Sequence, residues 1–312
     1  MKSKSNPYLH TALFAAATLA LGTAAHAGTF YWDPDGSGTS GFGTAGGTWG
    51  SDAFWNTGGS GGTIDNTTIT TADDIFFGTA AAGLGAGTVT GPSTAQGFLN
   101  MTFGSASGAI DLSGGTLNLD SATGSTITVN NASDTISTNL QGSGGNLIKA
   151  GTGTLTLTGA TNFTGAITVN SGNLTLRNGK GHFSGSGAVG NLTVNSGGTF
   201  DFSTNLTDNY ITLPTISLNS GAITGTDAGG HGVNSYIGFY TTAINATGNS
   251  SMSGLYVTHL QNSSGTIAID DEEVAEVVLR CLRRRKLAAV DGVRGTDDQR
   301  TRGLAEDLRE SR

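Results

Sequence analysis

Ser60 stands in a Gly-x-Ser-x-Gly pattern, from Gly58 to Gly62, which is typical of a nucleophilic serine on a sharp turn. Such a serine needs a strand before it and a helix after it, and the flanking sequence predicts neither. Two other patterns, Gly36–Gly41 and Gly185–Gly190, have the spacing of a dinucleotide-binding glycine loop. Neither opens a helix within a strand–helix–strand unit, so we expect turns at all three places.

Metal ligation is the next chemistry to consider. His182, His231 and His259 are the histidines beyond residue 27, and they share no spacing typical of metal ligands, so we expect surface histidines. The sequence Asp33-Pro-Asp35-Gly offers two carboxylates to Ca²⁺, but the other ligands of a calcium loop, including the closing Glu, are absent. We therefore predict an Asx-type turn at this place and no metal site.

Acid–base chemistry would require paired groups. Asp73 and Asp74 are adjacent, so in a strand they face opposite sides and cannot act together on one substrate. Arg177 and Lys180 are the only basic pair between residues 28 and 266. A polysaccharide lyase or hydrolase would cluster carboxylates, or basic residues with a metal, in one groove; two Asp stacked beside Arg177 would favour that class. We assign no catalytic, cofactor-binding or metal-binding residue and no cofactor, and a secreted polysaccharide-active enzyme stays the alternative function.

The composition explains why reactive residues are scarce. Of 312 residues, 51 are Gly and only 12 % are charged, whereas ordinary proteins hold about 7 % Gly and about 25 % charged residues. Between residues 28 and 266, three basic residues stand against twelve Asp, so the clustered Lys and Arg that nucleic acids require are missing. Cys281 is the only cysteine, which excludes a disulfide framework.

The first 27 residues predict a secretory signal peptide. Lys2 and Lys4 precede an apolar run from Leu13 to Leu21, and Ala25-His26-Ala27 supplies the small residues of a cleavage site before Gly28. The apolar run is too short to span a bilayer permanently, and no second long apolar stretch follows. We expect an exported bacterial-type chain without a transmembrane segment.

Short strand patterns recur in the body of the chain. One set is Ile127–Asn130, Ile167–Asn170 and Leu192–Asn195; a second centres on Leu117-Asn-Leu119, Leu155-Thr-Leu157, Leu174-Thr-Leu176 and Phe200-Asp-Phe202. Apolar residues alternate with Thr and Asn, and Gly, Ser and Asn punctuate the strands as turns. Units this short bury a core only when stacked, so residues 63–266 predict a right-handed parallel β-helix with about 20–25 residues per coil and outward Asn ladders.

An aromatic block over residues 28–62 precedes these repeats. It contains all three Trp residues together with Phe30, Tyr31, Phe42 and Phe54. Because an open solenoid end invites aggregation, we interpret the block as an N-terminal cap. An aromatic platform for carbohydrate is the other interpretation.

The stretch from Gly142 to Leu176 resembles the autotransporter-associated β-strand repeat of large exported bacterial passenger proteins. The shared features are Leu147-x-Lys149-x-Gly-x-Gly-Thr-Leu-x-Leu, the turn Phe163-Thr-Gly and the closing Val169-Asn-x-Gly-x-Leu-x-Leu. The opening Trp32-Asp-Pro-Asp-Gly also looks like the mature start of such proteins. The resemblance implies a parallel β-helix at the cell surface or outside, with no catalytic residues.

Members of that family often end in a membrane-embedded β-barrel or a short sorting anchor, and we expect neither in the chain as written. Outer-membrane attachment would then require a further C-terminal module. The expected function is a spacer, matrix or adhesive element, whose partners would be surface or extracellular glycans or proteins and not nucleic acid.

The segment 267–312 differs abruptly from the body in composition, with ten basic and eleven acidic residues. Asp270–Ala289 has a helical pattern that includes the basic run Arg283–Lys286. Two interpretations stay open: a solvated, charged helical tail, or out-of-frame translation after a frameshift in a longer gene.

Overall fold

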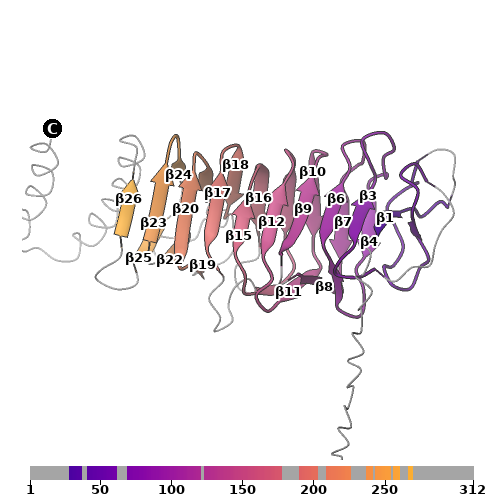
Figure 1. Cartoon of the computed structure of the whole chain (residues 1–312), viewed down its shortest axis with the longest axis horizontal. Helices are drawn as coiled ribbons and strands as arrows, with labels where there is room; N and C mark the ends of the chain where they lie inside the picture. The colour runs from indigo at the N-terminus through magenta and orange to yellow at the C-terminus, as the bar shows by residue number, and fades with distance from the viewer. Residues whose placement is uncertain are drawn as a thin grey trace, which may run out of the picture.

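The computed structural model describes residues 28–36, 41–61, 69–120, 123–177, 190–202, 209–225, 237–241, 243–253, 256–260 and 266–269. Every regular element in these ranges is a β-strand, and they stack into a rod with β1 at one end and β26 at the other (Figure 1). The predicted signal peptide and the predicted helix Asp270–Ala289 lie outside the described residues, so both stay predictions. In the described part of the chain, no helix is long and apolar enough to cross a bilayer.

The first sheet runs the length of the rod. Its order is β2 (Trp55–Asn56), β1 (Thr29–Trp32), β3 (Asp74–Phe77), β6 (Asn100–Phe103), β9 (Ser125–Val129), β12 (Leu147–Ala150), β15 (Ile167–Val169), β17 (Leu192–Asn195), β20 (Thr215–Asn219), β23 (Ala243–Thr247) and β26 (Thr266–Ile269). All these neighbours pair in parallel except β2, which is antiparallel to β1.

Two further faces complete each coil. The second sheet contains β24 (Ser251–Ser253), β21 (Ala222–Thr224), β18 (Gly198–Asp201), β16 (Gly172–Leu176), β13 (Thr154–Leu157), β10 (Ser133–Ile136), β7 (Ile110–Ser113) and β4 (Gly87–Thr90). The third sheet contains β14 (Thr161–Phe163), β11 (Asn139–Gly142), β8 (Thr116–Leu119) and β5 (Gln96–Phe98). A fourth, three-stranded sheet contains β19 (Asn209–Thr212), β22 (Ile237–Thr241) and β25 (Tyr256–Leu260).

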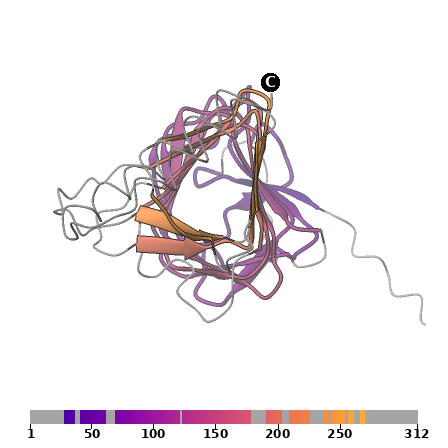
Figure 2. The same cartoon turned by 90° about the vertical axis from the view of Figure 1, so that its left-hand side faces the viewer.

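The chain visits the first, second and third sheets in turn and then returns to the first, as β6 to β9 illustrate. Viewed along the rod, the strands surround one central axis (Figure 2). Leu147, Ile167, Leu192 and Ile216 stack in one column, so the successive coils take 20, 25 and 24 residues. The predicted all-β parallel solenoid and its coil length are confirmed.

Strand alternation places the core between the sheets. In β13, Leu155 and Leu157 point inward and are buried, whereas Thr154 and Thr156 on the other face are partly exposed. The inward column of the first sheet begins with aromatic residues: Phe77 stacks on Phe103, and Val129 follows. The interior is therefore aromatic near the N-terminal end and aliphatic further along.

The N-terminal segment closes the edges of all three main sheets. β2 pairs with the outer edge of β1 through Trp32 and Trp55. Residues 43–49 pair with the edge of the second sheet, where Trp49 N donates to Thr90 O (2.9 Å) and Ala45 N donates to Gly85 O (3.0 Å). At the third sheet, the Gln96 side chain donates to Ile69 O. Unpaired strand edges recruit other chains, so this pairing is what a cap must provide.

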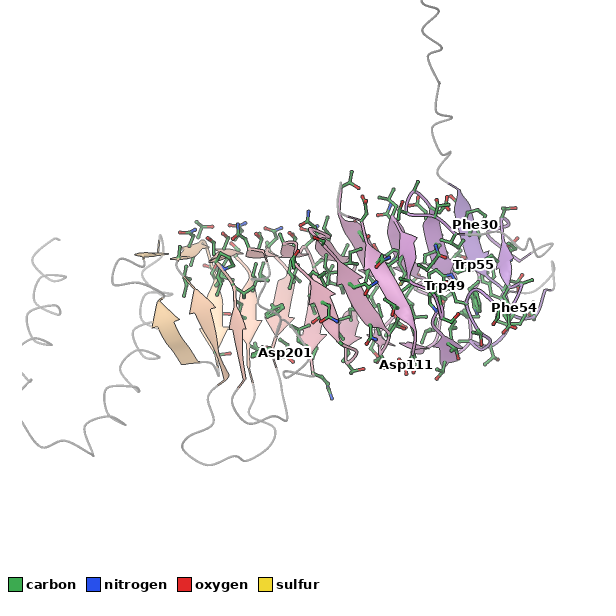
Figure 3. The ribbon with its side chains drawn as sticks, turned by 90° about the horizontal axis from the view of Figure 1, so that it is seen from below. Phe30, Trp49, Phe54, Trp55, Asp111 and Asp201 are labelled. Atoms are coloured by element: carbon green, nitrogen blue, oxygen red, sulfur yellow. The ribbon has the colours of Figure 1, made fainter. Side chains whose placement is uncertain are left out.

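The aromatic side chains hold this cap together from inside. Trp55 packs edge-to-face on Trp32 and Trp49, with ring centroids 4.9 and 5.2 Å apart, and Phe77 lies 5.9 Å from Trp55 (Figure 3). The three Trp side chains are at most 3 % exposed. Rings this deeply buried offer no platform to a sugar, so the aromatic block is packing core. β1 is also the first parallel strand of the first sheet, so cap and solenoid share one core.

Candidate functional site

The serine and glycine patterns lie in turns where they are described. Ser60 is exposed, and its turn is closed by a hydrogen bond from Gly61 N to Gly58 O (3.2 Å). No helix follows it within the described residues up to 61, so this serine lacks the strained elbow of a nucleophile. Gly62 and most of the two dinucleotide-type patterns, residues 37–40 and 185–189, lie outside the described residues.

Asp33 is a structural acceptor and not a metal ligand. Its side chain is fully buried and accepts hydrogen bonds from Gly36 N (3.2 Å) and Asn56 Nδ2 (2.7 Å). The predicted aspartate-supported turn is confirmed, whereas Asp35 is exposed. Across the described ranges, no three His, Cys, Asp or Glu side chains gather where they could hold a metal ion. His182 and His231 lie outside those ranges, and only the backbone of His259 is described, in β25.

Asp73 and Asp74 do face different directions. Asp73 is 4 % exposed and precedes β3; its carboxylate accepts from Thr70 N (2.7 Å), Thr70 Oγ1 (2.8 Å) and Gly28 N (2.7 Å). Asp74 lies on the outer face of the first sheet and accepts from Asn100 Nδ2 (2.7 Å). The two carboxylates serve separate backbone and side-chain partners and form no catalytic pair.

The carboxylates on the second sheet are also separated. Asp111 and Asp201 share one outward column, but three residues, Thr135, Thr156 and Thr175, lie between them. Four steps of about 4.8 Å place them roughly 19 Å apart, and Figure 3 shows them well apart along the rod. Arg177 is exposed just beyond β16, diagonal to Asp201 only. Two Asp stacked beside Arg177 are not found, and Lys180 lies outside the described residues.

Lys149 is buried, which the sequence analysis did not predict. It occupies an inward position of β12, between Ile127 and Val169, and its side chain is 0 % exposed. Its ammonium donates to three carbonyl oxygens at the corner that follows: Ala150 O (2.6 Å), Gly151 O (2.9 Å) and Ser171 O (3.2 Å). Burial lowers the pKa of this amine to about 8, and the nearby Asp134 carboxylate opposes that shift.

Asp134 is the second inward charge. It lies in β10, one coil before Lys149, in register with Leu155, and is 2 % exposed. Oδ1 accepts from Ile110 N (2.8 Å) and Asn131 Nδ2 (3.0 Å), whereas Oδ2 is buried without a hydrogen bond. Burial raises the pKa of the carboxyl to about 6, against the lowering effects of Asn131, Ile110 and Lys149.

Neither group can reach a substrate, because both side chains are enclosed by the coils. Their arrangement serves the corner between the first and second sheets, where Lys149 saturates carbonyl oxygens of two successive coils. The signal for their burial was present in the sequence. Leu147 and Ile136 are each two residues from the charged residue in the same strand, so strand alternation places Lys149 and Asp134 inside with them.

The outer faces are ladders of uncharged polar residues for most of their length. On the first sheet, Asn195 Nδ2 donates to Asn170 Oδ1 (2.8 Å), and Asn219 Nδ2 donates to Asn195 Oδ1 (2.9 Å), which confirms the predicted Asn ladder. On the third sheet, Asn118, Gln141 and Asn162 are in register. The arrangement can present a regular row of amide and hydroxyl groups but assembles no reactive centre.

One family model matches this chain. Residues 147–176, which form β12 to β16, match the passenger-associated-transport-repeat, and the resemblance found in the sequence is thereby confirmed. Repeats of this type are typical of the secreted passenger domains of autotransporters. No curated protein and no solved structure shows a significant match to the chain.

Proposed function

We propose that this chain is an exported structural protein, a passenger-type β-solenoid that acts as a spacer with adhesive faces at or outside the cell surface. The observation that carries the proposal is the combination of a continuous apolar interior with uncharged Thr and Asn ladders outside. The passenger-associated-transport-repeat at residues 147–176 and the signal-peptide pattern of residues 1–27 support export.

The chemistry of the ladders favours neutral partners. Rows of amides and hydroxyls offer both donors and acceptors at the coil spacing of about 4.8 Å, which suits the repeated hydroxyls of a surface or extracellular glycan. Anionic polymers would need clustered Lys or Arg, and only three basic residues occur between residues 28 and 266.

We propose no enzymatic role. The carboxylates of a glycosidase must lie about 5–9.5 Å apart, and the roughly 19 Å between Asp111 and Asp201 exceeds that range by a factor of two. The inward charged groups, Asp134 and Lys149, are closed to solvent.

Export and shape test the proposal together. The full chain is expressed in a Gram-negative host, and we expect it outside the cytoplasm with its leader removed. The matched control, Leu19→Arg, interrupts the apolar run of the leader and should hold the chain in the cytoplasm. Small-angle scattering of the exported chain should give the profile of a rod.

Two results would contradict the proposal. Cytoplasmic retention of the unaltered chain would remove the export claim. Release of reducing ends from a polysaccharide panel, abolished by Asp201→Asn, would establish the glycan-active enzyme class in place of the structural role.

A further inference from the structure

The carboxylate of Asp73 is bound to the main-chain nitrogen of Gly28. Oδ1 lies 2.7 Å from Gly28 N, and Oδ2 accepts from both Thr70 N and Thr70 Oγ1. Asp73 is 4 % exposed, so this is a buried acidic group with neutral donors. Buried carboxylates usually have a cationic partner. The two basic residues in the described ranges are elsewhere: Lys149 lies three strands further along the first sheet, and Arg177 follows β16.

Gly28 is also the residue that follows the expected cleavage site Ala25-His26-Ala27. Hydrolysis of the Ala27–Gly28 peptide bond consumes one water and leaves a carboxylate on Ala27 and an amine on Gly28. A free α-amine has a pKa of about 7.7–8.0 and is largely protonated at neutral pH. We propose that removal of the leader turns Gly28 N into an ammonium that pairs with the Asp73 carboxylate, and that this ion pair fastens the first strand of the solenoid. The inference rests on the export part of the proposed function.

The surroundings fix Gly28 in place for this contact. Its carbonyl oxygen accepts from Asp74 N (2.9 Å), and the next residue, Thr29, is in register with Asp74. A side chain at position 28 has no room, because a Cβ there would lie 2.4 Å from the Phe30 ring and 3.1 Å from Asp73 Oδ1. A residue without a side chain is therefore required where the mature chain would begin.

The contact lies where the rod needs it. β1 is the last parallel strand at this end of the first sheet, and beyond it only the two-residue β2 covers its edge. A charge-assisted hydrogen bond is roughly twice as strong as a neutral one, so processing strengthens the attachment of β1 to β3. The chain would thus complete its cap only after the leader has been removed.

The test compares four proteins. The full chain is purified before processing and after cleavage by purified signal peptidase, each with Asp73 or with Asp73→Asn. We expect processing to raise the thermal midpoint of the Asp73 protein by about 3 °C, and to leave the Asp73→Asn protein within about 1 °C. Asp74→Asn is the matched control: its carboxylate accepts from Asn100, so the gain on processing should persist.

The pH dependence separates an ion pair from a purely steric effect of the leader. Pairing raises the pKa of the α-amine in the folded state, so the gain is present below about pH 8 and lost as the pH rises through the folded value. Equal gains with Asp73 and with Asp73→Asn, or a gain that persists unchanged to high pH, would overturn the ion pair. Cleavage at another bond would overturn it too. Failure of export in the host, with the ion pair intact after cleavage by the purified enzyme, would instead count against the proposed function alone.

Discussion

Asp134 and Lys149 lie on successive coils of the solenoid, and both point inward in columns that apolar residues otherwise fill. Lys149 stands between Ile127 and Val169, and Asp134 is in register with Leu155. Each is buried, and each has its pKa shifted toward the neutral form by that burial. The repeat therefore places its charged lysine where it supports the backbone of a corner and not where it meets a partner.

Replacing Lys149 tests this structural role. Lys149→Met removes the donor to Ala150 O, Gly151 O and Ser171 O and leaves Asp134 without its cation, so we expect a loss of about 3 kcal/mol in the free energy of unfolding. Urea unfolding measures it. Arg177→Met is the control, because Arg177 is exposed and its replacement should cost no more than about 0.5 kcal/mol. Equal losses in the two variants would contradict the buried role.

Stability should depend on pH in two windows. The pKa of Asp134 is raised from 3.8 to about 6 in the folded chain, so its contribution is full below about pH 4 and is lost as the pH rises through 6. The pKa of Lys149 is lowered from 10.5 to about 8, so its contribution is present above about pH 10.5 and is lost as the pH falls through 8. The combined contribution is smallest between pH 6 and 8.

The measurement is the urea midpoint at half-unit steps from pH 4 to 7. The loss assigned to Asp134 over that window is on the order of 3 kcal/mol, and Asp134→Asn should abolish it. Asp111→Asn, on the outer face of the second sheet, should keep the decline. A decline of the same size in the Asp134→Asn variant would show that other groups cause it.

Strand alternation made the strands, their faces and the solenoid predictable, but it left the register open. Ile167 and Leu192 stack as their motifs suggest. The similar segment Ile127–Asn130 is shifted by two residues, so that Ile127 aligns with Lys149 and Val169. A shift of two keeps every side chain on its face, so the hydrophobic pattern cannot distinguish the two registers; a shift of one would have inverted the faces.

Sheet membership was similarly hidden. Leu155 and Leu174 stack in the second sheet as their shared motif predicts, whereas Leu117-Asn-Leu119 belongs to the third sheet, where Leu117 aligns with Leu140. One strand motif serves either face, because all three sheets present the same inward environment. The buried ionic corner was missed because charged residues were expected outside, although the alternation of Leu147 and Lys149 placed both on one face.

Trp55 should control both the stability and the solubility of the N-terminal end. Trp55→Ala removes ring contacts with Trp32, Trp49 and Phe77 and frees β2 from the edge of β1, so we expect a loss of about 3–5 kcal/mol together with self-association. Phe200→Ala makes a comparable cavity in the middle of the second sheet, where no edge is opened. Unfolding and light scattering check the pair: aggregation of both variants alike, or of neither, would refute the capping role.

Gly153 is the position at which the repeat leaves least room between coils. A Cβ at this residue would lie 2.0 Å from Asn131 O and 2.7 Å from Val129 Cγ1, and the first of these is backbone that cannot move aside alone. Gly153→Ala must therefore widen the spacing of about 4.8 Å between two coils, with a cost of about 3 kcal/mol or more. Gly197→Ala is the matched control: Gly197 has a φ of +79° and no atom within 4 Å of its would-be Cβ, so only the left-handed backbone conformation opposes the change, at about 1–2 kcal/mol. Thermal unfolding should separate the variants by several degrees, at about 2–4 °C per kcal/mol. Equal midpoints would mean that the glycines of the repeat are kept for their backbone conformation, whereas the larger drop for Gly153→Ala would show that close packing between coils requires the glycine at position 153.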